Sequence, residues 1–151
     1  MTEPISDLPS HLGYWLRFVS NHVSQSFARK VEARGVTVAE WVLMRGMLDG
    51  EAVAPSRLAE KLGLTRGTVS KLADRLEAKA LLRRVPDPED GRGQFISLSP
   101  AGRRLVPQLA ALADANDAEF FAQLSAADRK ALFRILRGIV AERGLTAPPI
   151  E

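Results

Sequence analysis

One short stretch of the chain concentrates small and cationic side chains that can bind an anion. The run RGTVSKLADRLE begins at Arg66, and six of its residues are hydrogen-bond donors, cations or glycine: Arg66, Gly67, Thr68, Ser70, Lys71 and Arg75. Arginine and lysine donate to anionic oxygens and other acceptors, and hydroxyl groups both donate and accept. The chemistry available here is therefore recognition of a polar, negatively charged surface.

A second polar group lies further along the chain, in the stretch DPEDGRG that begins at Asp87. Proline, aspartate and glycine favour turns, and this stretch places one arginine, Arg92, two residues after Asp90. Asp90 can therefore orient Arg92 across the intervening Gly91. A plain surface turn that carries an exposed arginine is the alternative interpretation.

The rest of the sequence excludes several classes of activity. There is no cysteine, so disulfides, thiol nucleophiles and Cys-ligated zinc are excluded. There is also no G-x-S-x-G elbow, phosphate-binding glycine loop or His-rich metal motif, so we expect neither an enzyme nor a cofactor. No apolar run approaches the ~20 residues that span a bilayer, and the first residues do not resemble a secretory signal. We therefore expect a soluble, cytoplasmic protein.

The net charge of +3 is small, but it is unevenly distributed. Residues 57–92 hold nine basic and six acidic side chains, whereas the rest of the chain holds twelve of each. The positive excess thus lies in the same segment as the candidate binding residues. This distribution suits one positive face offered to a polyanion, although scattered charges on a solvated surface would explain it equally well.

Hydrophobic spacing predicts the elements that precede this segment. Apolar residues recur at steps of three and four from Leu12 to Val31, which predicts a helix from about 9 to 34. The run from Thr37 to Glu40 is typical of a capping box, in which the Thr oxygen accepts an early N–H and the Glu carboxylate reaches back to the cap. It predicts a second helix that ends near residue 48.

The next two predicted helices form a compact unit. Pro55 suits the first turn of a short third helix, Gly63-Leu64 supplies a turn, and Thr65 caps a fourth helix that reaches about Lys79. At 100° per residue, the fourth helix directs Val69, Leu72, Ala73 and Leu76 inward and Gly67, Ser70, Lys71 and Asp74 outward, with Arg66 and Thr68 on the flanks. This is the helix-turn-helix pattern, whose second helix lies in the DNA major groove and contacts bases and phosphates.

After Leu81 the apolar period changes from helical to extended. Strands over residues 82–85 and 95–98 enclose the polar loop, so a β-hairpin follows the helix-turn-helix directly and completes a winged helix. The tip of such a hairpin can reach the minor groove. There Arg92 suits the negative potential of a narrow, A·T-rich groove.

Two more helices follow the hairpin. Ser99-Pro100 opens a helix that reaches about residue 124, and the capping box from Ser125 to Asp128 opens another that ends at Gly144. The first helix and these last two carry apolar stripes that a small winged helix cannot cover alone. A second copy of the chain is the simplest cover, so we expect a homodimer.

Four segments, in this order, resemble the MarR-type transcriptional regulators over residues 8–143. They are VTVAEWVLMRGM, SRLAEKLGLTRGTVSKLADRLEAKALLRR, DPEDGRG and ISLSPAGRRL. The family's wing carries an Asp-x-Arg signature that Asp90-Gly91-Arg92 matches, and its recognition helix carries contacts at the positions of Arg66, Thr68, Ser70 and Lys71. The resemblance implies a homodimer that binds a pseudo-palindromic operator in double-stranded DNA, usually as a repressor relieved by a small, often aromatic or phenolic, anionic ligand.

The predicted fold is mainly α with a small β-hairpin. Residues 37–99 form the winged helix DNA-binding domain. The first and last two helices, within residues 1–36 and 100–144, form a helical dimerisation domain. Residues 145–151 are expected to be a loose tail.

Two positions depart from the family pattern. The family commonly has glycine just after the recognition helix, where this chain has Ala80. A left-handed backbone there would cost alanine on the order of 1 kcal/mol, so the alternative is that the helix ends slightly later. Gly91 stands where many relatives have a second basic residue, which removes one phosphate contact.

An effector site is predicted less directly. His11, Trp15, Trp41 and Met44 are candidates to line a cavity between the dimerisation helices and the winged helix, although aromatic and methionine side chains on helical stripes also serve as ordinary core. His11 and His22 are about 16 Å apart along a helix axis, so they do not share a metal ion within one chain. The competing hypothesis, a dimeric winged-helix adaptor that binds protein instead of DNA, predicts a neutral or acidic outer face and a wing without Arg92.

Overall fold

The computed structural model describes residues 2–146 and 148–150. A short 3₁₀ turn, η1 (Leu8–Ser10), precedes the helices α1 (Leu12–Glu32), α2 (Val38–Met47), α3 (Pro55–Leu62) and α4 (Arg66–Ala78). The strands β1 (Leu82–Pro86) and β2 (Gln94–Leu98) follow, and the helices α5 (Pro100–Phe121) and α6 (Ala126–Arg143) come last. The predicted fold class, mainly helical with one antiparallel hairpin, is confirmed.

Side-chain caps start four of these helices at the predicted residues. Thr37, Thr65, Ser99 and Ser125 each accept, through the hydroxyl oxygen, the N–H three residues further on at 3.0–3.1 Å. Only this half of the two predicted capping boxes forms: within the described residues, neither Glu40 nor Asp128 returns a side-chain bond to its cap. The predicted role of Glu40 as a cap partner is therefore wrong. Its carboxylate instead accepts from Lys79.

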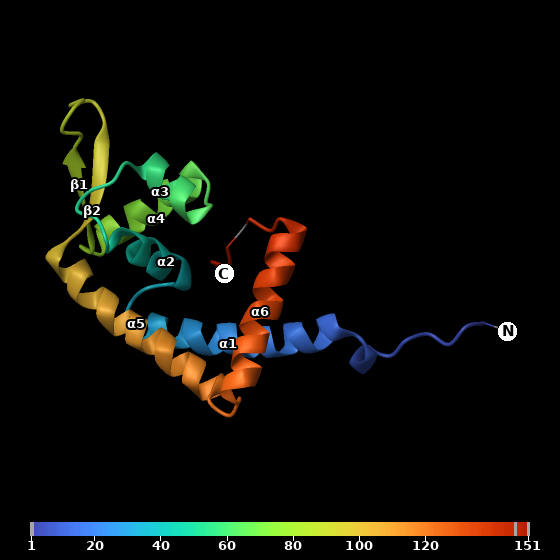
Figure 1. The fold of residues 1–151 in the computed structure, drawn as a ribbon. Coiled ribbons are helices and arrows are strands. Elements are labelled where there is room, and N and C mark those ends of the chain that lie inside the picture. Colours follow the sequence, from blue (N-terminus) through green and yellow to red (C-terminus); the bar gives the residue numbers. More distant parts are fainter. Residues whose placement is uncertain (1, 147, 151) are drawn as a thin grey trace.

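The long helices α1 and α5 pack side by side and form the base of the molecule, on which α2 rests (Figure 1). A polar cluster joins them, in which Ser26 and Asn116 are buried. The Lys30 ammonium donates to Ser26 Oγ, Asn116 Oδ1 and Glu119 Oε2 at 2.6–2.9 Å. Asn116 in turn donates to the Val23 carbonyl at 3.1 Å. Because these bonds are directional, they align α1 against α5 more strictly than apolar contacts alone would.

The apolar core lies mainly among α2, α3, α4 and β2. Its largest fully buried members there are Leu43, Met44, Leu58, Leu76 and Ile96. It continues between α1 and α5 through Val31, Val106 and Leu109. The winged helix and the base thus share one core.

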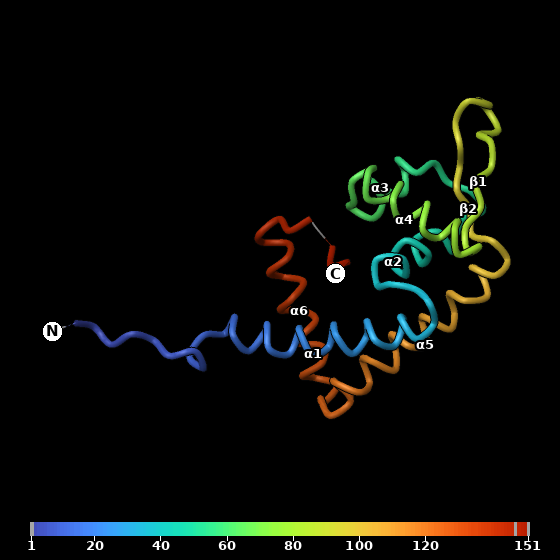
Figure 2. Tube along the Cα trace, turned by 180° about the vertical axis from the view of Figure 1, so that it is seen from behind, coloured from blue at the N-terminus to red at the C-terminus, as the bar shows by residue number. Residues whose placement is uncertain are grey.

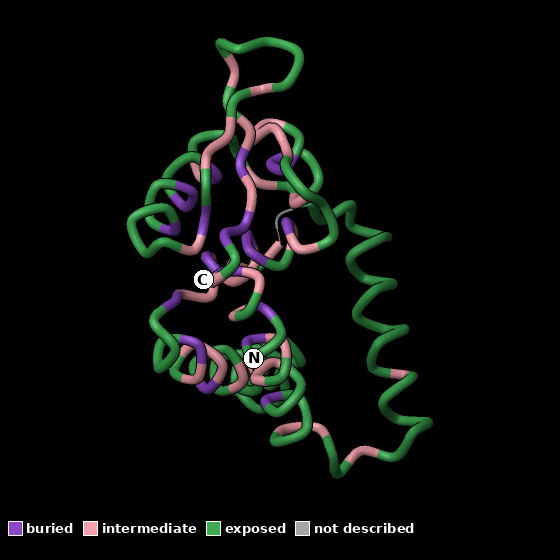
Figure 3. The backbone as a smooth tube through the Cα atoms, turned by 90° about the vertical axis from the view of Figure 1, so that its left-hand side faces the viewer, coloured by how far each residue is buried: buried purple, intermediate pink, exposed green. Residues whose placement is uncertain are grey.

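The helix α6 is different, because it buries no residue (Figure 3). It leaves the end of α5 and stands apart from the rest of the molecule. Its large apolar side chains are 38–48% exposed. The first half of α1 is likewise exposed on its apolar side. Within one chain, the predicted stripes of α1 and α6 are therefore largely uncovered.

The hairpin has the predicted strands, each one residue longer. Leu82 pairs with Leu98 at the base and Pro86 with Gln94 at the far end. Val53 adds an antiparallel bridge, because it exchanges two backbone hydrogen bonds of 2.9 Å with Ile96. The sequence analysis assigned no extended residue there, since one valine in a short loop shows no alternation.

The end of α4 decides the question raised by Ala80. The helix ends at Ala78, and Ala80 has φ 61°, in the left-handed region. The Ala80 N–H donates to the Glu77 carbonyl and the Leu81 N–H to the Leu76 carbonyl, both at 2.9 Å, which is the Schellman arrangement. The alternative in which the helix ends later is therefore wrong: the chain turns sharply here despite the cost to alanine.

The predicted tail, 145–151, lies partly outside the described residues, since 147 and 151 are not described. The described part returns toward the winged helix (Figure 2). A Cβ placed on Gly63 would lie 3.0 Å from the Thr146 carbonyl oxygen and 3.4 Å from Pro148 Cδ. These tail residues therefore contact the turn between α3 and α4.

Candidate nucleic-acid interface

The turn between α3 and α4 is built around Gly63. Its φ of 70° lies in the left-handed region that favours glycine. The Leu64 N–H then donates to the Ala59 carbonyl at 2.9 Å, and α4 begins two residues later. The unit α3–turn–α4 is the predicted helix-turn-helix.

The residues of α4 that face the core are the ones that the helical spacing predicted. Val69, Leu72, Ala73 and Leu76 are at most 4% exposed and belong to the core. The opposite face is exposed at Arg66, Gly67, Ser70, Lys71 and Arg75, and Thr68 is half-buried beside them. We call these six residues the reading face.

Three cations of the reading face are available to a partner. Within the described residues, Arg66, Lys71 and Arg75 take part in no ion pair. A Cβ added at Gly67 would meet nothing within 4 Å. An approaching molecule therefore meets open space at Gly67, beside side chains of arginine and lysine.

Thr68 is partly committed to the cap of α4. Its N–H donates to Thr65 Oγ1 at 3.1 Å, and its hydroxyl oxygen accepts from the Thr65 hydroxyl at 2.8 Å. The Thr68 hydroxyl keeps its own proton. It can therefore donate to an acceptor such as a phosphate oxygen.

Arg84 neutralises the acidic side of α4, a role that the sequence analysis missed. From β1 its guanidinium pairs with Asp74 and, at 3.3 Å, with Glu77. Asp74 was predicted on the outer face, where an unpaired carboxylate would repel phosphates. The signal was present in the sequence: two acids three residues apart share one helix face, and a basic strand follows.

The wing, residues 87–93, is shaped by two aspartates. Asp87 Oδ1 accepts the Glu89 N–H at 2.8 Å, and Asp90 Oδ1 accepts the Arg92 N–H at 3.1 Å. The Gly93 N–H donates to the Asp90 carbonyl at 3.0 Å and closes the tip. Asp90 thus orients the backbone of Arg92, and within the described residues the Arg92 guanidinium takes part in no ion pair.

The loop of the hairpin projects beyond α3 and α4, at the end of the molecule away from α1 and α5 (Figure 1). Its aspartates are used in turns, and its arginine is exposed. The reading face therefore presents donors and positive charge, and the neighbouring wing adds the exposed cation of Arg92. This arrangement suits a ligand with regularly spaced negative charge.

The four candidate effector residues do not come together in one chain. Met44 is fully buried core, whereas Trp41 is half-buried and lines an open hollow of about 300 Å³ with Arg45 and Lys61. His11 and Trp15 lie at the exposed start of α1. There His11 Nδ1 and Trp15 Nε1 each lie 2.9 Å from a backbone carbonyl oxygen, of Asp7 and Pro9 respectively.

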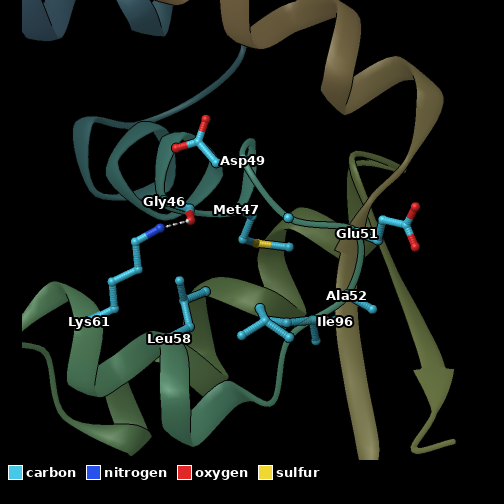
Figure 4. Close-up of a pocket in the computed structure, with 10 residues that line it drawn as sticks. Gly46, Met47, Asp49, Glu51, Ala52, Leu58, Lys61 and Ile96 are labelled. Carbon is cyan, nitrogen blue, oxygen red and sulfur yellow. Dashed lines mark hydrogen bonds between the residues drawn. The ribbon is translucent and has the colours of Figure 1, made fainter.

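A second hollow, of about 180 Å³, lies between α2, α3 and the Val53 bridge. Met47, Leu58 and Ile96 form its apolar floor, while Asp49 and Glu51 point away from it (Figure 4). The Lys61 ammonium donates to the Gly46 carbonyl at 2.9 Å across its edge. Among the described residues, the charged side chains that line this hollow point away from it or lie across its edge. The hollow can therefore fit a small apolar ligand, but it offers few polar groups to distinguish one such ligand from another.

Neither a metal centre nor a membrane-spanning helix is found in the described part of the chain. No three His, Asp or Glu side chains in it gather closely enough to hold a metal ion. None of its helices combines the length and the apolar character needed to cross a bilayer.

Comparisons with known proteins agree with this geometry. The model of the MarR family matches residues 34–93, which include the helix-turn-helix and the wing. Among curated proteins, the transcriptional regulator HosA of Escherichia coli O111:H- is 26% identical over 106 residues, which cover 70% of this chain and 78% of HosA.

Two solved structures share the fold over most of the chain. A probable transcriptional regulator from Pseudomonas aeruginosa superposes with a TM-score of 0.75 at 26% identity, covering 88% of this chain and 99% of that one. Bordetella bronchiseptica BpsR, whose DNA binding is regulated by 6-hydroxynicotinic acid, superposes with a TM-score of 0.76 at 25% identity, covering 90% and 97%. The matched segment, the winged helix and the shared fold agree with one another: residues 34–93 match the MarR family, and the similar proteins named above include transcriptional regulators with the same fold.

Proposed function

We propose that the chain acts as a homodimer that binds a pseudo-palindromic operator in double-stranded DNA, represses transcription there, and is released by a small aromatic anion. It works in the cytoplasm, together with the DNA that it binds. The observation that carries the proposal is the charge arrangement on α4. Its outward cations are free of ion pairs among the described residues, while its outward acids are held by Arg84.

The uncovered apolar stripes support a dimer. On α6, Leu132, Leu136 and Ile139 are 38–45% exposed, and on α1 Leu12, Leu16 and Val19 are 46–80% exposed. Large apolar side chains at helical spacing, exposed to this degree on two long helices, are of the kind that marks an interface. A second copy of the chain carries the same surface and can cover it symmetrically.

In this dimer each reading face enters one major groove. Arg66 and Lys71 are the candidates for guanine, Thr68 and Ser70 contact bases or phosphates, and Arg75 binds a phosphate. Gly67 lets the helix approach closely. The wing places Arg92 in the adjacent minor groove, with its backbone oriented by Asp90.

The ligand is proposed from the open hollow at Trp41. An indole beside the cations Arg45 and Lys61 suits an aromatic ring that carries a carboxylate, which would compete with Asp49, now 3.3 Å from the Arg45 guanidinium. BpsR, with the same fold, is regulated by such an acid. Met44 supports this hollow from the core, and His11 and Trp15 contribute only if dimerisation brings the start of an α1 helix near it.

A selection of bound sequences from a random duplex pool tests the operator. We expect inverted repeats with about 10 base pairs between half-site centres, since two symmetric recognition helices address grooves one turn apart. Lys71→Ala should relax the preference at one position in each half-site if Lys71 contacts a base. A loss equal on all sequences assigns Lys71 to phosphate, and Lys130→Ala on α6 is the charge-matched control.

A salt titration separates DNA binding from the adaptor hypothesis. Phosphate contacts release counterions, so the logarithm of the binding constant should fall linearly with the logarithm of salt concentration. An adaptor that binds only protein would give no such binding to duplex DNA. Repeating the selected-operator measurement with aromatic acids present tests release, and unchanged affinity across a series of such acids would count against the proposed ligand class.

A further inference from the structure

An ion pair with a buried carboxylate joins the end of α4, the proposed recognition helix, to the start of α2. The Lys79 ammonium donates to both carboxylate oxygens of Glu40, at 2.8 and 2.7 Å, and to the Gly35 carbonyl at 2.9 Å. The Glu40 side chain is 1% exposed, whereas that of Lys79 is 38% exposed. All three ammonium protons therefore have an acceptor, and the carboxylate is held away from water.

The three partners come from parts of the chain that are far apart. Lys79 is the C-cap residue of α4, Glu40 lies in the first turn of α2, and Gly35 lies between α1 and α2. Gly35 has φ 85° and ends α1, so its carbonyl marks where the chain leaves the base and enters the winged helix. The ion pair thus ties α4 to the crossing from α1.

The same end of α4 is tied to the second crossing as well. The Ser99 hydroxyl donates to the Ala80 carbonyl at 2.8 Å, and Ser99 is the N-cap residue of α5. The C-terminal end of the recognition helix is therefore attached at both points where the chain passes between the winged helix and the base. The opposite end of α4, at Arg66, has no such attachment in the described residues.

From this geometry we infer that the Glu40–Lys79 pair is a positioning device that sets the spacing of the two half-sites. The inference rests on the proposed homodimer. The 13 residues of α4 extend about 20 Å at 1.5 Å per residue. A rotation of about 10° at the attached end would move Arg66 by roughly 3.5 Å, close to the rise of one base pair along a strand. The angle at Lys79 therefore determines which spacing both reading faces can match at once.

The test uses a double variant, Glu40→Leu with Lys79→Met. It replaces the pair by apolar side chains of similar size, so no charge is left buried alone and the net charge is unchanged. The matched control is Arg129→Gln with Asp117→Asn, which removes an exposed ion pair between α6 and α5 and also leaves the net charge unchanged. Lys79 and Glu40 themselves are not on the reading face, so direct base contacts remain in both variants.

The measurement is the dissociation constant for a series of duplexes in which the selected half-sites are moved apart or together by one base pair at a time. For wild type and control, a shift of one base pair should lower the affinity about tenfold or more, because one reading face then misses its base contacts. The double variant should bind the duplex of best spacing more weakly than wild type does. A shift of one base pair should lower its affinity only about threefold, since a less constrained α4 can match both spacings. Its affinity for a single half-site should match that of wild type.

An unchanged spacing profile in a folded double variant would reduce the pair to a purely structural role and overturn the inference. If the double variant melts below the assay temperature, Glu40→Gln is measured on the same series, and the same flattening is expected. A wild type that binds DNA with no spacing preference also overturns the inference, whereas a wild type that binds no duplex removes the proposed function itself.

Discussion

The side chain of Ser99 joins the end of α4 to the start of α5. Its hydroxyl donates to the Ala80 carbonyl at 2.8 Å and accepts the Gly102 N–H at 3.0 Å. Ser99 thus caps α5 and also holds Ala80, just beyond the end of α4. Ala80, at φ 61°, is held in a conformation that alanine adopts at a cost. The turn is maintained because both of its ends are bonded.

Replacing Ala80 by glycine should relieve this strain. Glycine adopts the left-handed conformation freely, so Ala80→Gly should raise the free energy of unfolding by about 0.5–1 kcal/mol, measured by urea denaturation. Ala78→Gly, in the last turn of α4, is the control and should lower stability by about 1 kcal/mol. A destabilising Ala80→Gly would contradict the left-handed assignment.

Replacing Gly102 by alanine should have the opposite effect. A Cβ on Gly102 would lie 2.2 Å from the Leu81 carbonyl oxygen, so α5 and the start of the hairpin must separate. Gly102→Ala should cost about 1–3 kcal/mol in thermal or urea unfolding, the usual range for overpacking. Gly138→Ala is the control: nothing lies within 4 Å of its Cβ position, and it should stabilise α6 by up to about 1 kcal/mol.

Leu136→Asp tests the proposed dimer. If the apolar side of α6 lies in the interface, an aspartate there is buried without a partner, and the dimer should dissociate about 100-fold more readily or worse. Analytical ultracentrifugation measures this directly. Arg134→Gln changes the net charge equally but lies off the apolar stripe, and it should leave the dimer intact. An unchanged dimer for Leu136→Asp would remove Leu136 from the interface.

Arg92→Ala tests the wing. A minor groove that is narrow and A·T-rich attracts arginine most strongly, so the loss of affinity should be largest for operators with A·T-rich flanks and smallest for G·C-rich flanks. Asp90→Ala should give a smaller loss of the same kind, because it frees the Arg92 backbone that its carboxylate now orients. Equal losses on both flanks, with a salt slope shallower by about one, would assign Arg92 to a phosphate instead.

The Lys30–Glu119 contact should make stability depend on pH. The hydrogen bond from Lys30 lowers the pKa of the Glu119 carboxyl below its ordinary value of 4.5, against a smaller opposing effect of desolvation. Because the folded pKa is the lower one, the unfolded chain binds more protons as pH falls through this range, and the contribution is lost on acidification. The melting-temperature difference between wild type and Glu119→Gln should therefore shrink as pH falls below 4.5.

Much of the fold follows from local sequence alone. Four helices are capped by Thr37, Thr65, Ser99 and Ser125, whose hydroxyl oxygens each accept the backbone N–H three residues further on. Such a cap depends only on neighbouring residues. The outward direction of the reading face follows from helical periodicity, which placed Val69 and Leu76 inward. The caps and the helical phase depend on residues close together in the chain, so the amino-acid sequence alone determines them.

Other features were decided only by the tertiary structure. Glu40 has the correct spacing to return to its cap at Thr37, yet its carboxylate pairs with Lys79, because packing buries the carboxylate and brings the ammonium group within 2.7 Å of it. Asp74 has the spacing of an outward residue, but β1 brings Arg84 against it. Ala80 adopts a left-handed conformation that its own preference opposes, because Ser99 and the Schellman bonds hold the turn. At Glu40 and Ala80 a contact with a distant residue outweighs a local preference of about 1 kcal/mol. At Asp74 the sequence indicates that a basic partner is available, but only the packing of β1 against α4 selects Arg84.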